Sequence, residues 1–165
     1  MRDKESQTFA NQKWLVALFL GVHILQMYQL SSSLYSYILH EEPLFSKGGL
    51  FLFWLGFLVF TIAFFNLKLI TQFVDSHIVV SYWPFLWRPL DISKEDIKSI
   101  EIRTYKPLLE FGGWGYRIGW SGFTAYSTHG KTGVFIELKH GKKVMIGTQK
   151  PDIWQKWIQE IYAVN

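Results

Sequence analysis

Two long stretches without a charged side chain most constrain what this 165-residue chain can fold into. Residues 14–39 and residues 48–67 contain no Asp, Glu, Lys or Arg. A helix needs about 20 mostly apolar residues to cross a hydrocarbon core of roughly 30 Å. Both stretches reach that length, and only residues 40–47 separate them. The sequence therefore predicts a hairpin of two transmembrane helices.

The hairpin divides the chain into three parts. Residues 1–13 are expected to form an N-terminal tail, residues 14–67 the transmembrane hairpin, and residues 68–165 one small soluble domain. Cations lie in the tail and after the second stretch, whereas the connecting loop carries Glu41 and Glu42. Because Lys and Arg are retained on the cytoplasmic side, we expect both termini in the cytoplasm.

The first stretch has a polar stripe. Gln26, Gln29 and Ser33 recur at spacings of three and four, so they share one helix face. We expect this face to form interhelical hydrogen bonds with the second helix or with another subunit, or to lie at the membrane interface. A transport path is the alternative interpretation, but the stretch contains no carboxylate or Lys to support it.

The second stretch has a stripe of small residues. Gly49, Gly56 and Ala63 lie seven residues apart, and small residues let two helix backbones approach closely. We expect the stripe to pack against the first helix. Self-association of two copies is the competing interpretation.

The pattern changes after residue 67 to short β-branched and aromatic segments broken by turns. Strands are predicted at 67–74, 77–83, 97–105, 116–120, 123–127, 134–138 and 144–146, with a turn at His140-Gly141 before the last. Pro151 then fits the first turn of a helix whose apolar face carries Trp154 and Trp157. The pattern predicts an antiparallel β-barrel or sandwich with a C-terminal capping helix.

Three segments carry a resemblance to a known family: Arg103–Leu108 (RTYKPL), Glu110–Arg117 (EFGGWGYR) and Gly147–Pro151 (GTQKP). With the two apolar stretches, they resemble small bacterial membrane proteins that have two transmembrane helices and a pleckstrin-homology-like (PH-like) domain. The resemblance implies a PH-like antiparallel barrel with a C-terminal capping helix, held at the inner (cytoplasmic) membrane. It implies no catalytic residue, cofactor or reaction.

The glycine-rich segment 111–117 is the most unusual part of the predicted domain. Trp114, Tyr116 and Arg117 are of the types that dominate binding hot spots, so they are candidate binding residues. The alternative is a bulged strand entry in which Trp114 is buried and Arg117 pairs with a carboxylate such as Glu110. No Lys-Ser/Thr pair follows the glycines, which argues against a phosphate loop.

Lysines cluster around the last predicted turn. Lys142 and Lys143, with Lys139 and Lys150, are candidates for contact with anionic lipid headgroups, and a solvated turn is the alternative. The formal net charge is only +4, and the chain carries no recognised nucleic-acid motif, so nucleic acid is not an expected partner.

The sequence gives no support for catalysis. It has no Cys, its five His show no metal-binding spacing, and it has no nucleophile-elbow motif. We therefore predict a non-enzyme without metal or cofactor. The expected function is a membrane-anchored binding or scaffold protein with membrane lipid and a protein, or a second copy, as partners. The alternative is an accessory subunit of a larger membrane complex that packs through its helices.

Overall fold

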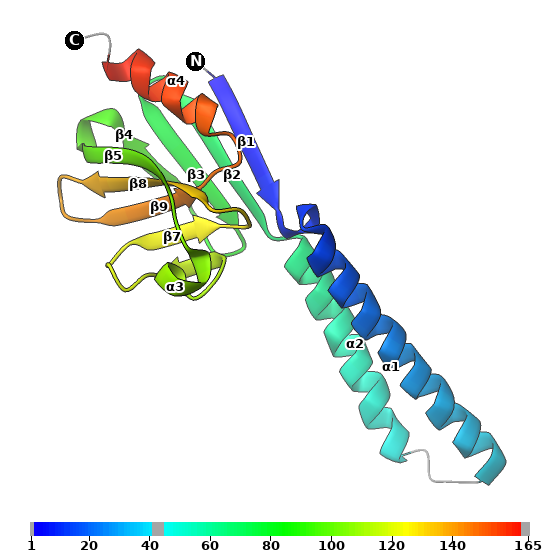
Figure 1. Cartoon of the computed structure of the whole chain (residues 1–165). Coiled ribbons are helices and arrows are strands. Elements are labelled where there is room, and N and C mark those ends of the chain that lie inside the picture. Colours follow the sequence, from blue (N-terminus) through cyan, green and yellow to red (C-terminus); the bar gives the residue numbers. More distant parts are fainter. Residues whose placement is uncertain (1, 41–44, 163–165) are drawn as a thin grey trace. The chain divides into compact units, whose positions relative to one another are not determined.

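The computed structural model describes residues 2–40 and 45–162 (Figure 1). The chain forms two compact units. One is a pair of long helices over residues 9–66, and the other is a mainly-β domain made of residues 2–8 and the chain from residue 67 onward.

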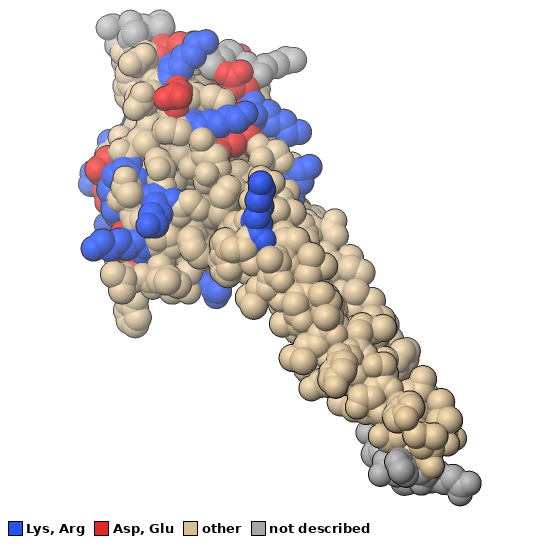
Figure 2. All heavy atoms as spheres, turned by 45° about the vertical axis from the view of Figure 1, so that its right-hand side comes forward, with Lys and Arg blue, Asp and Glu red and all other residues tan. Residues whose placement is uncertain are grey.

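The helical unit begins with a short 3₁₀ turn, η1 (Phe9–Asn11), followed by α1 (Lys13–His40) and α2 (Phe45–Phe65). Both helices are long and apolar enough to cross a membrane. Figure 2 shows charged side chains gathered on the β domain, while the visible helix surface is almost free of them. Between the helices, Phe19 packs against Phe57, Phe64 and Phe65, with ring centroids 5.1–5.6 Å apart.

The first sheet contains β1 (Arg2–Thr8), β2 (Lys68–Val74), β3 (His77–Trp83) and β4 (Leu90–Ser93). These strands are antiparallel neighbours in the order β1-β2-β3-β4. The β1–β2 register runs from Arg2 opposite Val74 to Thr8 opposite Lys68. The two helices are therefore inserted between adjacent strands. Residues 2–8, which we expected in a tail, instead form an edge strand of the domain.

The second sheet contains β5 (Ile97–Thr104), β6 (Gly115–Ile118), β7 (Thr124–Ser127), β8 (Thr132–Leu138) and β9 (Lys143–Gly147). Its order is β5-β8-β9-β7-β6. A short helix, α3 (Pro107–Phe111), precedes β6, and α4 (Pro151–Tyr162) ends the described chain. The predicted C-terminal helix is present, whereas the pattern did not reveal β1, β4 or α3.

The main core lies between the two sheets and α4. Trp154 and Trp157 of α4 are fully buried, and Phe73 of β2 meets the Trp154 ring edge-on at 4.8 Å. A second apolar cluster covers the other face of the second sheet, where Phe111 of α3 packs near Phe135. The second sheet is thus covered on both faces, so β8 and β9 are apolar at successive positions.

The barrel prediction needs correction. The described strands form two separate sheets and no closed barrel, and the predicted all-antiparallel arrangement fails where β7 runs parallel to β9. The strands divide into two sheets at the 3₁₀ turn η2 (Lys94–Asp96). The Ser93 hydroxyl caps this turn by accepting a hydrogen bond from the Glu95 N–H. This turn carries the chain out of one sheet at β4 and into the other at β5.

Candidate functional site

The glycine-rich segment is the connection between α3 and β6. Gly112 ends α3 in the left-handed conformation, with φ 69° and its N–H bonded to the Leu108 carbonyl. Gly113 and Gly115 also have positive φ, at 121° and 118°. Side chains are strained in this region, so the glycines are needed by the backbone itself. Sequence reasoning missed the short helix, although Pro107 and Gly112 are typical start and stop residues.

Trp114 is tied into the domain. Its side chain is half-buried, and its indole Nε1–H donates to the Gly130 carbonyl at 2.8 Å. This bond joins the α3–β6 connection to the turn between β7 and β8. The contact matches the structural interpretation of Trp114 more closely than a ligand-facing role.

The Glu110 carboxylate does not pair with Arg117. Its Oε2 accepts from Arg103 at 3.0 Å and its Oε1 accepts from the Lys106 N–H at 2.7 Å. Partial burial alone would raise the pKa of Glu110, but these two hydrogen bonds and the nearby cations outweigh it and lower that pKa. The suggested Arg117–Glu110 pair is therefore wrong, because Arg103 occupies the carboxylate.

Tyr116 and Arg117 lie on the exposed edge strand β6. The Tyr116 ring stacks on Phe85, from the loop between β3 and β4, at 6.1 Å. Arg117 is exposed and acts electrostatically on the buried Tyr82, whose pKa burial raises and the Arg117 charge partly lowers. The structure thus brings Tyr116 and Arg117 beside the β3–β4 loop, which the sequence did not single out.

Large apolar side chains are exposed along these segments. We define the apolar rim as the exposed large apolar residues at the end of β3, in the β3–β4 connection, in α3, in β6 and in the β6–β7 connection: Trp83, Phe85, Trp87, Leu108, Leu109, Tyr116, Ile118 and Trp120. Trp87 and Trp120 are 95% and 93% exposed. Several large apolar side chains exposed on neighbouring segments are typical of an interaction site.

Close contacts connect the parts of the rim. Phe85 stacks on Tyr116, as described above, and Gly119 lies against α3. A Cβ on Gly119 would come within 2.6 Å of the Phe111 ring and 3.0 Å of the Glu110 carbonyl. The bond from the Gly122 N–H to the Gly119 carbonyl, 3.0 Å, then closes a turn with Trp120 at its tip. Within the β domain, α3 and the end of β3 lie at the end opposite α4 (Figure 1).

The predicted lysine pair lies at the β8–β9 turn. Lys143 pairs with Glu137 at 3.1 Å and lies 5.4 Å from the Phe123 ring, while Lys142 is exposed. Lys143 is therefore partly neutralised, and Lys142 is the more available cation of the two. Contact with lipid headgroups stays a prediction for both.

A buried polar cluster holds β1 in place. Glu5 and Gln7 are each 2% exposed. The Glu5 carboxylate accepts from the Thr148 hydroxyl and the Gln149 N–H, both at 2.7 Å, and from the Gln7 amide at 2.9 Å. The Gln7 amide also donates to the Gly147 carbonyl at 2.8 Å. These polar groups satisfy one another's hydrogen bonds, so we assign the cluster a structural role.

The helix residues fall in different environments. Gln26 and Ser33 are half-buried, whereas Gln29 is exposed, so the polar stripe is split. The prediction that the small stripe packs on the first helix is wrong for the described pair. Nothing lies within 4 Å of a Cβ built on Gly49 or Gly56, and Ala63 is exposed. Phe19 and its aromatic partners fill the contact instead, so the small residues face outward.

His23 joins the two helices. Its Nε2 lies 3.1 Å from the Thr61 hydroxyl, and its ring lies 5.0 Å from that of Phe57. This contact agrees with a packing and hydrogen-bonding role. Among the described residues, no group of three His, Cys, Asp or Glu side chains is placed to hold a metal ion.

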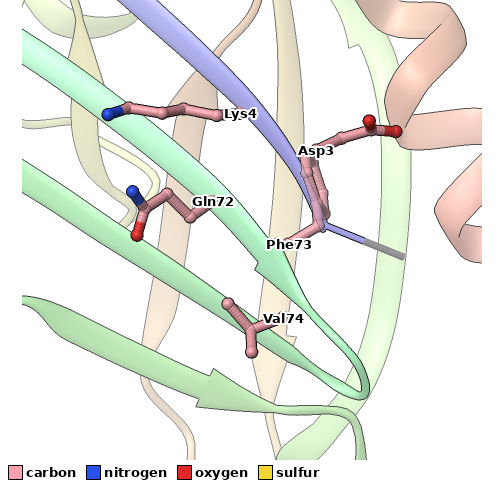
Figure 3. A pocket seen from close by; sticks show the side chains of 5 residues that line it. All are labelled: Asp3, Lys4, Gln72, Phe73 and Val74. Atoms are coloured by element: carbon pink, nitrogen blue, oxygen red, sulfur yellow. The ribbon is translucent and has the colours of Figure 1, made fainter.

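A pocket of about 400 Å³ lies beside β1 and β2, lined by Asp3, Lys4, Gln72, Phe73 and Val74. Lys4 and Gln72 extend side by side from the neighbouring strands, and Asp3 points away from them (Figure 3). The polar groups do not converge on one point, as those of a ligand site do.

Comparison with family models, curated proteins and solved structures found no match for this chain.

Proposed function

We propose that this protein is a membrane-anchored, non-enzymatic binding or scaffold protein that presents its β domain at the cytoplasmic face of a bacterial inner membrane. The pairing of Thr8 with Lys68 carries the proposal. These residues flank the inserted helices, so the chain leaves and rejoins the sheet at one end. A hairpin that crosses the membrane twice satisfies this connection, because it returns the chain to the side from which it entered.

The cytoplasmic orientation rests on the cations of the domain and on the two glutamates between the helices. The PH-like assignment of the domain rests on the resemblance. It is supported by two packed sheets of four and five strands and by a C-terminal helix with two buried Trp. The apolar rim and the exposed Arg117 supply the binding surface.

An accessory-subunit role is the second candidate. The outward-facing stripe of Gly49, Gly56 and Ala63 supports it, because a stripe of small residues lets the helix of a neighbouring subunit approach closely. In this role the helices, and not the domain, make the decisive contacts.

The test is purification of the full chain from native membranes in mild detergent. We expect a complex with a second protein or a second copy. Loss of the complex in Arg117→Ala supports binding through the domain, and loss in Gly56→Leu with Ala63→Leu supports assembly through the helices. A monomer that retains neither protein nor lipid would contradict both candidates.

A further inference from the structure

We infer that the apolar rim is a second membrane contact, which inserts into the headgroup region of the same bilayer that the protein's own helices cross. The inference rests on the proposed membrane anchoring and assigns the ligand of the rim, a lipid surface. According to this inference, the β domain also binds the membrane surface through its own side chains, in addition to its covalent connections to α1 and α2.

The two tips of the rim are built to project. In the β3–β4 connection, Leu86 packs against the main core and its N–H bonds to the Tyr82 carbonyl at 2.8 Å. This anchoring leaves the next residue, Trp87, 95% exposed. At the second tip, Gly119 lies against α3 and Trp120 is 93% exposed. Trp is the residue most typical of the membrane–water interface, since its ring is apolar and its N–H remains hydrated.

The first sheet has one aromatic end and one polar end. At the polar end, the turns contain Asp75 and Ser76 and the charged segment 94–96. At the aromatic end, Trp83 lies opposite Lys68, and Lys68 follows α2 after two residues. The chain alone therefore holds Trp83 within roughly 16 Å of the last residue of α2. The aromatic end is therefore the end at which the sheet connects to the helices of the proposed membrane anchor.

The charge of the rim suits an anionic lipid surface. Residues 83–90 contain Arg88 and residues 112–124 contain Arg117, and neither segment contains Asp or Glu, while Glu110 of α3 is paired with Arg103. Lys68 adds a cation beside Trp83. Protein partners also use aromatic and Arg side chains. The membrane is favoured because the proposed anchoring tethers the domain to it through two short connections, which gives it a high effective concentration.

The chain has no Cys, so single cysteines can carry a nitroxide spin label without background. Ser121→Cys places the label beside Trp120 and leaves every rim residue in place. Ser76→Cys is the matched control at the polar end, and Leu52→Cys, at an exposed position of α2, reports on the hairpin. Each full-length variant is reconstituted in nanodiscs containing one-third anionic phospholipid, and collisions with oxygen and with a water-soluble nickel chelate are measured.

We expect the label at residue 121 to be shielded from the nickel chelate and open to oxygen, and the label at residue 76 to be open to the chelate. Trp87→Ser with Trp120→Ser should remove the shielding at residue 121. Both rings are almost fully exposed, so these substitutions leave the fold intact. Val74→Ser with Tyr162→Ser, at exposed apolar positions outside the rim, should change nothing.

Arg88→Ala and Arg117→Ala should each lower the ratio of membrane-bound domain, in which residue 121 is shielded, to unbound domain about five-fold in anionic nanodiscs. Neither substitution should change this ratio in zwitterionic nanodiscs. If residue 121 is open to the chelate while residue 52 lies in lipid, the inference is wrong and the rim is left for a protein. If residue 52 is itself open to the chelate, the proposed membrane anchoring fails as well.

Discussion

The Glu5 carboxylate accepts a 2.7 Å hydrogen bond from the Thr148 hydroxyl, across 143 residues of sequence, and both side chains are almost fully buried. Because Glu5 lies on β1 and Thr148 follows β9, this bond fastens the strand that precedes the helices to the second sheet. The hairpin is therefore held at both ends by one folded domain, through β1 and through β2.

Glu5→Ala should destabilise the β domain by about 3 kcal/mol, because it removes the carboxylate that accepts three hydrogen bonds, including those of the buried Thr148 and Gln7 side chains. Hydrogen exchange of the β1 amides in the full chain measures the effect, and exchange there should accelerate first. Ser6→Ala, on the exposed face of the same strand, should change stability by less than about 0.5 kcal/mol. Equal effects of the two substitutions would show that the buried cluster does not hold β1.

A chain in which residues 9–67 are replaced by Asn-Gly should fold as a soluble domain. Thr8 and Lys68 are opposite each other, so a two-residue turn can close β1 and β2 into an ordinary hairpin. Cooperative unfolding and protected β1 amides are the expected results. A matched chain that begins at residue 68 lacks Glu5 and Gln7 and should be less stable. Equal stability of the two would contradict the role of β1.

The stability of the domain should fall as the pH drops below about 6.5. Burial lowers the pKa of His129, and nearby Glu5 only partly raises it again. The unfolded chain then binds a proton at a higher pH than the folded chain, so stability is full above the unfolded value of about 6.5 and is lost toward the lower folded value. Thermal unfolding between pH 7.5 and 5.5 should show this loss in the parent and less of it in His129→Gln. If the stability of the variant depends on pH as steeply as that of the parent, His129 is not the cause of the loss.

Gly119→Ala should destabilise the domain by about 1–3 kcal/mol, since the new Cβ meets the Phe111 ring and the Glu110 carbonyl. The substitution should also make the turn that carries Trp120 more mobile. The fluorescence of Trp120, measured in a variant whose other Trp residues are replaced by Phe, reports this change. Ser121→Ala, in the same turn but exposed, is the control and should be neutral.

The predictable parts of the fold are those with an apolar pattern. The two apolar stretches contain most of α1 and α2, and short β-branched and aromatic segments between turns located β2, β3 and β8. Strand β1 was not predicted because its inward positions are Glu5 and Gln7, which are stabilised in the interior by hydrogen bonds with a segment distant in sequence. The two-sheet arrangement escaped because a 3₁₀ turn and a parallel β7–β9 pair leave no periodic signal.

The candidate site was only partly predictable for a related reason. The glycine-rich segment 111–117 indicated part of the site, because Tyr116 belongs to the apolar rim, where it stacks on Phe85, and Arg117 follows it on β6. Trp87 and Trp120 stand outside that segment, and residue type alone does not distinguish an exposed Trp from buried ones such as Trp154. Their exposure depends on how Leu86 and Gly119 anchor the neighbouring chain.

The most direct test of the central claim is the membrane sidedness of three single cysteines in the full chain. Ser6→Cys lies on β1, His140→Cys at the β8–β9 turn, and Gly48→Cys near the start of α2. In sealed vesicles of one orientation, a membrane-impermeant maleimide should label residues 6 and 140 from the same side of the membrane. It should label residue 48 only from the opposite side. Labelling of residues 6 and 140 from opposite sides, or of all three from one side, would contradict a membrane-crossing hairpin inserted between paired strands.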